Sequence, residues 1–320
     1  MVEAKASGGS GPTAGPGCPL CGLGLQRRYD GIVADETGEM FGVVACPGCG
    51  LGRTHPTPPD LDPYYRATYY GNRHGLTARY CARRRLRLVG REAGAGRSLL
   101  DYGSGDGGFA RAARADGWDV CGVERHRPDP APADPPVVSG LDELEGRPPF
   151  DAATFWHVLE HLDDPVDVLT RLRRHLKSGA FVVAAVPNFG SWQARAAGAS
   201  WLHLDIPRHL SHFTARSLAR TFEAGGYRAE VRARGEWEYD VIGWSQGLLN
   251  RHLGGRNEFF RAMSGRPDAG PAPRRRVQVA AGLGLSALAA LPAWGEGRID
   301  RAGTLIAVAR PLAGGGDGHA

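Results

Sequence analysis

The residues best suited to ligand chemistry form a glycine-rich turn at residues 99–108. An apolar run ends in Asp101, and glycines follow at Gly103, Gly105 and Gly107. Glycines at this spacing let a backbone turn sharply and let a ligand approach the main chain closely. The helical pattern that comes next would offer unpaired N–H groups in its first turn. A carboxylate placed before the glycines suits a ligand that carries a cationic amino-acid group.

A second acid stands where a bound ribose would lie. Residues 120–123 have the pattern of a short apolar strand, and Glu124 follows them. An acid about 20 residues beyond such a turn, at the tip of the second strand, is placed to accept hydrogen bonds from both ribose hydroxyls. The turn and Glu124 therefore predict a nucleoside-containing ligand.

A third strand pattern completes the set of motifs. It covers residues 150–156, with Trp156 at its end and His157 directly after. In combination, the turn, the two acids and this strand resemble the class I S-adenosylmethionine-dependent methyltransferases over about residues 98–311. The resemblance implies an α/β domain with a Rossmann-like, seven-stranded, mostly parallel sheet whose last strand is antiparallel. An unliganded turn of similar shape and a nicotinamide-dependent enzyme are the alternatives.

The same resemblance assigns residues to the cofactor, S-adenosyl-L-methionine. Asp101 and the three glycines are expected to hold its methionine part, and Glu124 its ribose. Asp142 follows the third short strand, where the family touches the adenine. Trp156 and His157 complete the predicted cofactor-binding set.

Two Cys-x-x-Cys pairs precede this domain. Cys18 and Cys21 form the first pair, Cys46 and Cys49 form the second, and a glycine follows each. Each pair is a tight turn that aims two thiolates at one point, and four thiolates make a closed tetrahedral zinc site. Disulfides and a redox pair are the alternatives, but the absence of a visible secretory signal favours a reducing compartment. We therefore expect a small structural zinc ribbon at residues 18–53.

A zinc ribbon ahead of a methyltransferase domain resembles two known arrangements, the sugar C-methyltransferases and certain ribosomal-RNA guanine methyltransferases. The formal charge of +5 could suit RNA. Lysine occurs only at Lys5 and Lys177, however, so the charge reflects an arginine-rich composition rather than a basic patch. Between its cysteine pairs the ribbon has only Arg27 and Arg28 as basic residues and few aromatic residues on which RNA bases would stack. A nucleic-acid partner is therefore not expected.

The loop after Trp156 contains His157, Glu160 and His161. It is similar to the loop that closes over the methyl group in this family. In the more distantly similar ubiquinone-pathway O-methyltransferases, a Glu-x-x-Glu-His segment here binds a divalent cation, and His157 stands in place of the first Glu. The resemblance implies either a divalent cation at His157, Glu160 and His161 or a general-base role for His161. The alternative is that these groups only brace the loop.

Residues 201–214 hold an unusual concentration of polar groups: three histidines, an arginine and an aspartate. The segment resembles a Trp-x-His-x-Asp-x-Pro-Arg-His-Leu signature of bacterial methyltransferases. Ligands of such sheets bind beyond the carboxyl ends of the strands, where this segment would lie. We expect His209 or His212 to act as the base, and Arg208 to hold an anionic or polyhydroxylated acceptor. A polar network that anchors the loop is the alternative.

Composition divides the rest of the chain. Its 320 residues suffice for one large domain and a small one. The expected organisation is a disordered tail at residues 1–17, the ribbon at 18–53, a linker and helical cap at 54–97, the methyltransferase domain at 98–311 with a helical insertion at about 235–301, and a disordered tail at 312–320.

The insertion contains a long apolar run. Residues 277–293 are apolar apart from Gln278 and Ser286, and residues 274–276 are all arginine. A membrane-spanning helix needs about 20 strongly apolar residues, so a span is not expected. A helix lying on an anionic membrane through residues 274–293, a lid over an apolar acceptor and a dimer surface are the alternatives.

These features predict a cytoplasmic enzyme, with contact at the membrane surface as a further expectation. The expected reaction is in-line methyl transfer to a small-molecule, sugar or lipid-linked acceptor, with a histidine that removes the acceptor's proton. An RNA methyltransferase that reads RNA through its ribbon and a non-catalytic scaffold are the alternatives. The pattern does not choose among O-, N- and C-methylation or between oligomeric states.

Overall fold

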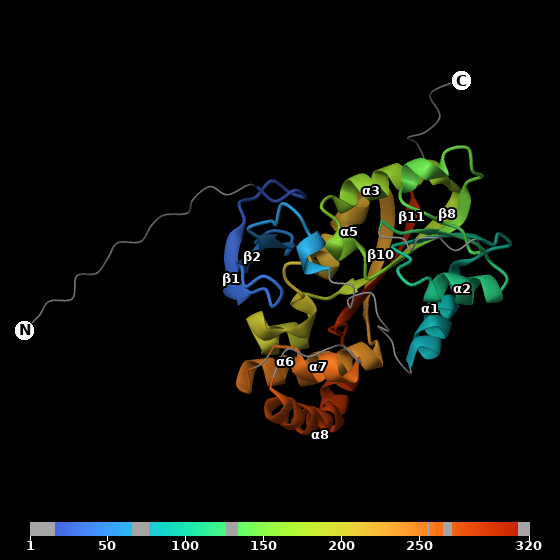
Figure 1. Ribbon diagram of the computed structural model, residues 1–320. Coiled ribbons are helices and arrows are strands. Elements are labelled where there is room, and N and C mark those ends of the chain that lie inside the picture. Colours follow the sequence, from blue (N-terminus) through green and yellow to red (C-terminus); the bar gives the residue numbers. More distant parts are fainter. Residues whose placement is uncertain (1–16, 66–76, 126–133, 255, 265–270, 313–320) are drawn as a thin grey trace, which may run out of the picture.

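The computed structural model describes residues 17–65, 77–125, 134–254, 256–264 and 271–312 (Figure 1). The tails predicted at residues 1–17 and 312–320 lie outside this part of the chain except for Gly17 and Leu312, and so does part of the predicted linker and cap. The described chain has an α/β domain at its centre, a small sheet on one side and a layer of helices below (Figure 1).

The central sheet has seven strands. In spatial order they are β10 (Tyr227–Arg234), β11 (Thr304–Pro311), β8 (Leu176–Pro187), β7 (Phe150–Trp156), β4 (Ser98–Tyr102), β5 (Asp119–Val123) and β6 (Val137–Val138). β11 runs antiparallel to both of its neighbours, and the other pairs are parallel. The prediction of a seven-stranded, mostly parallel sheet with an antiparallel last strand is confirmed.

Helices cover both faces of this sheet because its strands are apolar on both sides. Leu99 and Leu100 are neighbours on β4, yet their side chains belong to the two different buried clusters on opposite faces. The helices on the Leu99 face are α1 (Ala78–Glu92) and α2 (Gly108–Ala115), and those on the Leu100 face are α3 (Pro165–Leu172) and α5 (Ala215–Ala224). Asp164 caps α3 by accepting hydrogen bonds from two backbone N–H groups, and Thr214 caps α5.

The cysteine-containing segment forms a second, four-stranded sheet. Three strands come from this segment, β1 (Gln26–Val33), β2 (Met40–Ala45) and β3 (Gly52–His55). The fourth, β9 (Ser211–His212), comes from the histidine-rich segment and pairs with β3. Because a strand of the large domain completes the small sheet, the ribbon is joined to that domain by main-chain hydrogen bonds.

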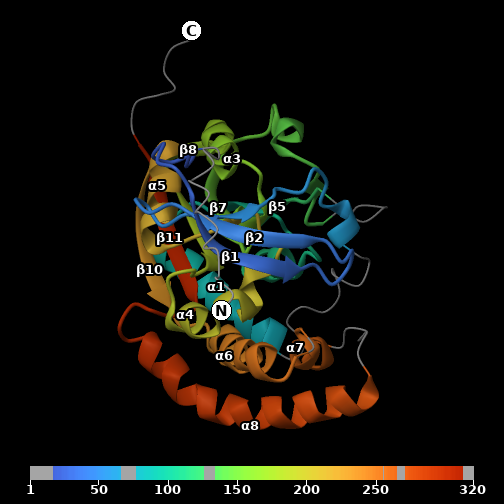
Figure 2. The same cartoon turned by 90° about the vertical axis from the view of Figure 1, so that its left-hand side faces the viewer.

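The insertion between β10 and β11 is helical, as predicted. It consists of α6 (Trp237–His252), α7 (Glu258–Met263) and α8 (Ala272–Glu296). α8 lies along the outer edge of the molecule, with α6 and α7 between it and the rest of the protein (Figure 2). The short helix α4 (Trp192–Ala197) connects the end of β8 to the histidine-rich segment at residues 201–214, which begins with the 3₁₀ helix η8 (Leu202–Leu204).

Two buried acids of this insertion, Asp240 of α6 and Glu296 of α8, are hydrogen-bonded to Gln193 of α4. Gln193 donates hydrogen bonds from its Nε2 to Asp240 at 3.2 Å and to Glu296 at 2.9 Å. Burial and the neighbouring Glu296 carboxyl raise the pKa of Asp240 to about 8, and burial raises the pKa of Glu296 to about 7. Both acids hold their protons in the folded protein at a pH where the unfolded chain has lost them.

Stability is therefore expected to fall as the pH rises from about 4.5 to about 8. Glu296→Gln is expected to flatten this slope and to raise the free energy of unfolding at pH 8 by about 1–2 kcal/mol. Urea denaturation at pH 5 and pH 8 measures the effect. Glu230→Gln, on the exposed side of β10, is the control and should keep the wild-type slope. An unchanged slope in Glu296→Gln would contradict the linkage.

Candidate functional site

The glycine-rich turn lies between the end of β4 and the start of α2. Gly103, Gly105 and Gly107 all have positive φ angles, 72°, 55° and 73°, which favour glycine. A Cβ atom at Gly103 would lie 2.4 Å from the Val158 side chain, whereas one at Gly105 would have nothing within 4 Å. The turn therefore packs against the protein at Gly103 and leaves its main chain accessible at Gly105.

The two predicted acids flank this turn. Asp101 is buried and accepts a hydrogen bond from the Thr154 hydroxyl at 2.8 Å. Burial raises the pKa of Asp101 to about 7, although the Thr154 hydrogen bond acts in the opposite direction. Glu124 accepts a hydrogen bond from the Gly105 N–H at 2.8 Å. Glu124 thus holds the turn at Gly105, and Asp101 joins the end of β4 to β7.

A cavity of about 470 Å³ opens beside the turn. Five predicted cofactor residues line it: Asp101, Gly103, Gly105, Trp156 and His157. The lining also includes residues from α1, from the start of α2 and from α6. The glycine turn and the end of β7 therefore contribute to one concave site, as the motifs predicted.

Three other predicted cofactor residues are placed differently. Gly107 lies in the turn and Glu124 bonds to it, but neither is among the residues that line this cavity. Asp142 is exposed at the start of a 3₁₀ turn and forms an ion pair with Arg171 at 2.7 Å. Its carboxylate already has a partner on α3, so the structure does not bring it into the cavity.

The cavity holds buried polar atoms that lack partners within the described residues. The hydroxyl of Ser104 and the indole Nε1 of Trp156 are both buried without a hydrogen bond. Both residues line the cavity. A buried polar atom without a partner costs free energy, so these atoms favour a polar ligand. Together with Asp101, they fit a ligand that has an amino-acid end.

The insertion supplies a wall that the motifs did not reveal. His157 has a φ of 57°, and its ring stacks on Tyr239 of α6 with centroids 5.0 Å apart. Its Nε2 lies 3.3 Å from Glu236, and its Nδ1 lies 3.5 Å from Glu160. Burial opposes the charged imidazole, but the two carboxylates together raise the pKa of His157. Glu236 follows β10 directly, and an acid at the carboxyl end of a strand is the signal that could have found it.

A further contribution comes from α1. Arg85 is buried, and its guanidinium lies over the Trp156 ring, 5.0 Å from the ring centre. The sequence predicted a basic helical cap here, but only the three-dimensional contact shows that one of its arginines covers the cavity wall. The Arg84 guanidinium forms an ion pair with Glu236 at 2.5 Å, which ties the cap to the insertion.

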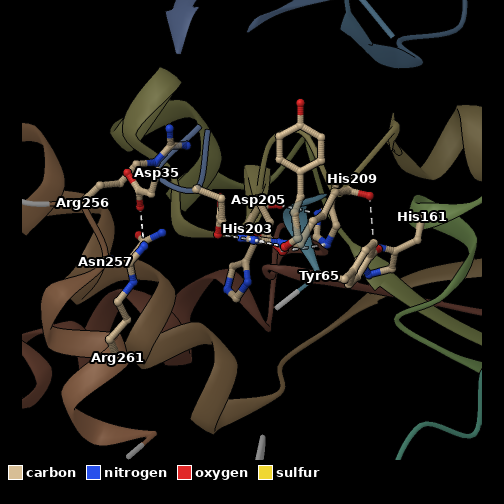
Figure 3. A network of polar contacts seen from close by, with 12 residues as sticks. Asp35, Tyr65, His161, His203, Asp205, His209, Arg256, Asn257 and Arg261 are labelled. Carbon is tan, nitrogen blue, oxygen red and sulfur yellow. Dashed lines mark hydrogen bonds and ion pairs between the residues drawn. The ribbon is translucent and has the colours of Figure 1, made fainter. Parts of the chain in front are cut away.

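Two of the predicted base candidates lie together (Figure 3). The rings of His161 and His209 are nearly perpendicular, with centroids 4.5 Å apart. His161 Nδ1 is 3.0 Å from the Arg208 carbonyl and 2.9 Å from the Tyr65 hydroxyl, and His209 Nδ1 is 3.0 Å from the His203 carbonyl. Because a carbonyl only accepts, Nδ1 of His209 carries the proton. The Tyr65 hydroxyl can donate or accept, so the tautomer of His161 follows from which of its two partners Nδ1 bonds. Burial lowers the pKa of His209 to about 4.

Arg208 and Asp205 connect this pair to the ribbon. Arg208 is buried and donates from Nε to Asp205 at 3.0 Å, and from one terminal nitrogen to Glu36 at 2.6 Å and to the Tyr64 carbonyl at 3.1 Å. Burial alone would raise the pKa of Asp205, but the Arg208 guanidinium beside it holds that pKa well below its usual range. Glu36 lies in the loop between β1 and β2, so the Arg208 guanidinium, predicted to hold the acceptor, contacts groups of the protein itself.

His212, the other predicted base, lies apart from this pair. It is buried on β9, and its Nε2 is 3.0 Å from the Thr54 hydroxyl of the ribbon. Burial lowers the pKa of His212 to about 3. The contact with Thr54 lies within the small sheet and joins β9 to β3 of the ribbon.

The four cysteines of the two pairs form a compact group. The Sγ atoms of Cys18 and Cys49 are 3.5 Å apart, and those of Cys21 and Cys46 are 3.3 Å apart. All four Sγ atoms lie within 4.8 Å of one another, and no disulfide joins them. Four converging thiols are the donor set of a structural zinc site, and the spacing fits one ion at their centre.

A second group of possible metal ligands lies at the histidine pair. Ligand atoms of Glu160, His161 and His209 all lie within 4.8 Å of one another. Glu160 is buried, and both of its carboxylate oxygens lack a hydrogen-bond partner within the described residues. The sequence predicted His157 as the third ligand. The structure places His209 in that group instead, while His157 lies between Glu160, 3.5 Å from its Nδ1, and Glu236, 3.3 Å from its Nε2.

Comparison with known proteins agrees with this geometry. Residues 72–230 match a family model described as a methyltransferase domain. The chain contains a class I methyltransferase domain. The matched residues include α1, the glycine turn, the end of β7 and the histidine-rich segment. The methyltransferase is therefore dependent on S-adenosylmethionine, and the fit of Asp101, Ser104 and Trp156 to an amino-acid end agrees with that cofactor.

Individual relatives of the methyltransferase are distant. It is 27% identical over 185 residues to the ubiquinone biosynthesis O-methyltransferase of Pseudomonas aeruginosa (strain UCBPP-PA14), over 52% of this chain and 77% of the relative. An S-adenosylmethionine-dependent methyltransferase from Archaeoglobus fulgidus has a TM-score of 0.43 and 18% identity, over 72% of this chain and 93% of that one. A putative sarcosine dimethylglycine methyltransferase from Galdieria sulphuraria has a TM-score of 0.43 and 16% identity, over 74% and 85%.

Proposed function

We propose that the methyltransferase methylates a hydroxyl group of a small-molecule, sugar or lipid-linked acceptor. The observation that carries this proposal is the pair of histidines, His161 and His209, in the segments that follow β7 and η8. A ring nitrogen of each lies within 4.8 Å of a carboxylate oxygen of the buried Glu160. The curated relatives are named for O-methyl transfer in ubiquinone biosynthesis, which supports a small hydroxylated acceptor rather than RNA.

Methyl transfer from a sulfonium is an in-line displacement, so alignment of the two reactants is the main requirement. Bound S-adenosylmethionine supplies an electrophilic methyl group. The acceptor oxygen forms the new bond to the methyl carbon while the carbon–sulfur bond breaks and its electron pair stays on sulfur. We assign removal of the acceptor's proton to Nε2 of His161, whose ring is held by the Arg208 carbonyl and the Tyr65 hydroxyl.

His161→Ala is expected to lower kcat by about 10²–10⁴-fold, because it removes the proton acceptor. The affinity for S-adenosylmethionine should stay within about twofold, since His161 does not line the described cofactor cavity. Transfer of a labelled methyl group to a panel of phenolic, sugar and lipid-linked hydroxyl acceptors measures the first effect, and calorimetric titration measures the second.

The matched control is His212→Gln. It is expected to lower stability through loss of the contact with Thr54, while kcat stays within a few-fold of wild type. If His212→Gln removes activity in a folded protein and His161→Ala does not, the assignment of the base is wrong. Methylation of RNA in place of every small acceptor would overturn the proposed acceptor class.

A divalent cation on Glu160, His161 and His209 is the alternative role for this cluster. One carboxylate and two imidazoles suit zinc, manganese or iron better than magnesium. A ligating His161 could not also take the acceptor's proton, so the two roles make opposite predictions. Activity that survives complete chelation favours the base, and activity restored by manganese or zinc favours the cation.

We also propose that Cys18, Cys21, Cys46 and Cys49 hold one structural zinc ion. The compact arrangement of the four thiols supports this proposal. A closed site with four protein ligands leaves no position for substrate, so the ion would stabilise the ribbon rather than take part in methyl transfer.

A further inference from the structure

Helix α8 has its apolar and polar faces reversed. Amphipathic helices of globular proteins turn their apolar side towards the core. The largest apolar side chains of α8 instead point outward: Val277 is 58% exposed, Leu283 56%, Leu288 69%, Leu291 75% and Trp294 57%. The residues on its buried side are small or polar, namely Gln278, Gly282, Ala289, Ala293 and Glu296.

Contacts on the inner side of α8 are specific and polar. The Ser286 hydroxyl lies 3.1 Å from the Ser245 hydroxyl of α6, and Glu296 accepts a hydrogen bond from Gln193 at 2.9 Å. Gln278 donates to the carbonyl of Gly254. The helix is therefore seated on α6 by groups that match its polar side, and its apolar side faces away from the protein (Figure 2).

The outward side chains form one continuous stripe. Val277, Leu283, Leu288, Leu291 and Trp294 recur at helical spacing, and the positions between them on this side are Ala280, Gly284 and Ala287, all exposed. The stripe is about 25 Å long at 1.5 Å per residue. An exposed apolar surface of this extent marks an interaction site.

Basic side chains outnumber acidic ones around the stripe. Arg275 and Arg276 are exposed at its N-terminal end, and Arg274 beside them forms an ion pair with Glu258 of α7. At the other end the Arg298 guanidinium lies 3.6 Å from the centre of the Trp294 ring, and Asp300 accepts a hydrogen bond from the Ala233 N–H. The one acid within α8, Glu296, is buried on the inner side. An anionic surface would therefore meet arginines at both ends of the stripe.

We propose that α8 docks the protein onto an anionic lipid surface, with the helix lying in the plane of the membrane. The leucines would enter the acyl boundary, Trp294 would sit at the level of the headgroups, and the arginines would contact lipid phosphates. If α8 instead packed against α8 of a second copy of this chain, arginines would face arginines. In a parallel pair the two arginine triplets would meet, and in an antiparallel pair each triplet would meet Arg298 of the other copy. Lipid phosphate complements both ends.

Docking on the surface fits better than crossing. Residues Pro273–Glu296 are the one stretch within the described chain that is long and apolar enough to span a membrane, with a mean hydropathy of 1.5 over an 18-residue window. A span would bring Gln278 and Glu296 into hydrocarbon and break their contacts with α6 and Gln193. Lying flat leaves those contacts in place.

Vesicle co-sedimentation of the full-length protein tests the proposal. Binding to phosphatidylglycerol–phosphatidylcholine vesicles is expected to be at least tenfold stronger than to phosphatidylcholine alone. The double variant Leu288→Asp, Leu291→Asp should lower binding to the mixed vesicles at least tenfold, and Arg275→Glu, Arg276→Glu should remove the preference for anionic lipid. Met40→Asp, an equally exposed apolar position on the ribbon, is the control and should bind as wild type.

Two further measurements make each outcome decisive. The Trp fluorescence of the wild type should shift to the blue on anionic vesicles, and this shift should be lost in Trp294→Phe. Titration with S-adenosylmethionine checks that each variant is folded. Absent vesicle binding at low salt overturns the proposal. A dimer in solution that Leu288→Asp, Leu291→Asp splits, without vesicle binding, would assign the stripe to a second copy of the chain.

Discussion

Asp101→Ala is expected to weaken binding of S-adenosylmethionine by at least about 30-fold. The Asp101 carboxyl is buried in the wall of the cofactor cavity, where little water could replace its contact with a cationic amino group. Truncation of one partner in a buried charge pair costs about 2–5 kcal/mol, and every 1.4 kcal/mol is a factor of ten. Calorimetric titration with S-adenosylmethionine and its demethylated product measures the loss.

The same carboxyl should make binding depend on pH. The pKa of Asp101 is about 7 before the ligand binds, because the group is buried. A cationic amino group favours the ionised carboxylate, so binding should release a proton and tighten as the pH rises. A pKa of 7 gives a gain in affinity of about fivefold between pH 6 and pH 7. Asp101→Asn should bind weakly with no such dependence.

Two variants bracket this result. Glu124→Ala is expected to weaken binding because Glu124 holds the turn through the Gly105 N–H and is the acid predicted to bind the ribose. Asp119→Asn, at the other end of the same strand, is exposed and should bind as wild type. Unchanged affinity in Asp101→Ala would show that the amino-acid end of the cofactor binds elsewhere.

Cys18→Ser is expected to release the zinc ion and to unfold the ribbon. Structural zinc contributes about 10–16 kcal/mol to the folding of small zinc domains, so loss of one thiolate has a large effect. Elemental analysis should give one zinc per wild-type chain and much less in the variant. Cys121→Ser, a buried cysteine of β5 outside the cluster, is the control and should keep the metal. Wild-type protein that is purified without metal and still folds the ribbon would contradict the site.

The effect should extend beyond the ribbon. β3 pairs with β9, and the Thr214 hydroxyl donates to the Cys49 carbonyl at 3.2 Å. Loss of zinc is therefore expected to speed amide hydrogen exchange at residues 211–213 as well as in β1–β3. If residues 211–213 exchange their amide hydrogens as slowly in the variant as in the wild type, the large domain holds this segment without the ribbon.

The fold was accessible from sequence because its signals are local. Strand β8 contains an unbroken apolar run, the turn after β4 has the glycines that its positive φ angles require, and Asp164 and Thr214 are residue types that favour the helix N-termini they cap. Each of these depends on residues within one element and its immediate neighbours.

The parts that sequence did not reveal depend on contacts between distant segments. Tyr239 and Glu236 reach His157 from an insertion, and no local pattern says against which face an insertion packs. Arg208 has the residue type of an acceptor ligand, but its partner Glu36 lies in the ribbon. Such pairings become visible only when both segments have been placed.

The position of the helical insertion has a consequence for how such enzymes diversify. Residues 235–303 replace what would otherwise be a short connection between the antiparallel strands β10 and β11. Doubling the length of a loop whose ends are already paired costs only about 0.6 kcal/mol in closure entropy. Strand pairing keeps the ends of the insertion fixed, while its outermost helix is free to vary. Substitutions on the outward side of α8 would therefore change what the surface of the enzyme can contact without altering the residues that line the cofactor cavity.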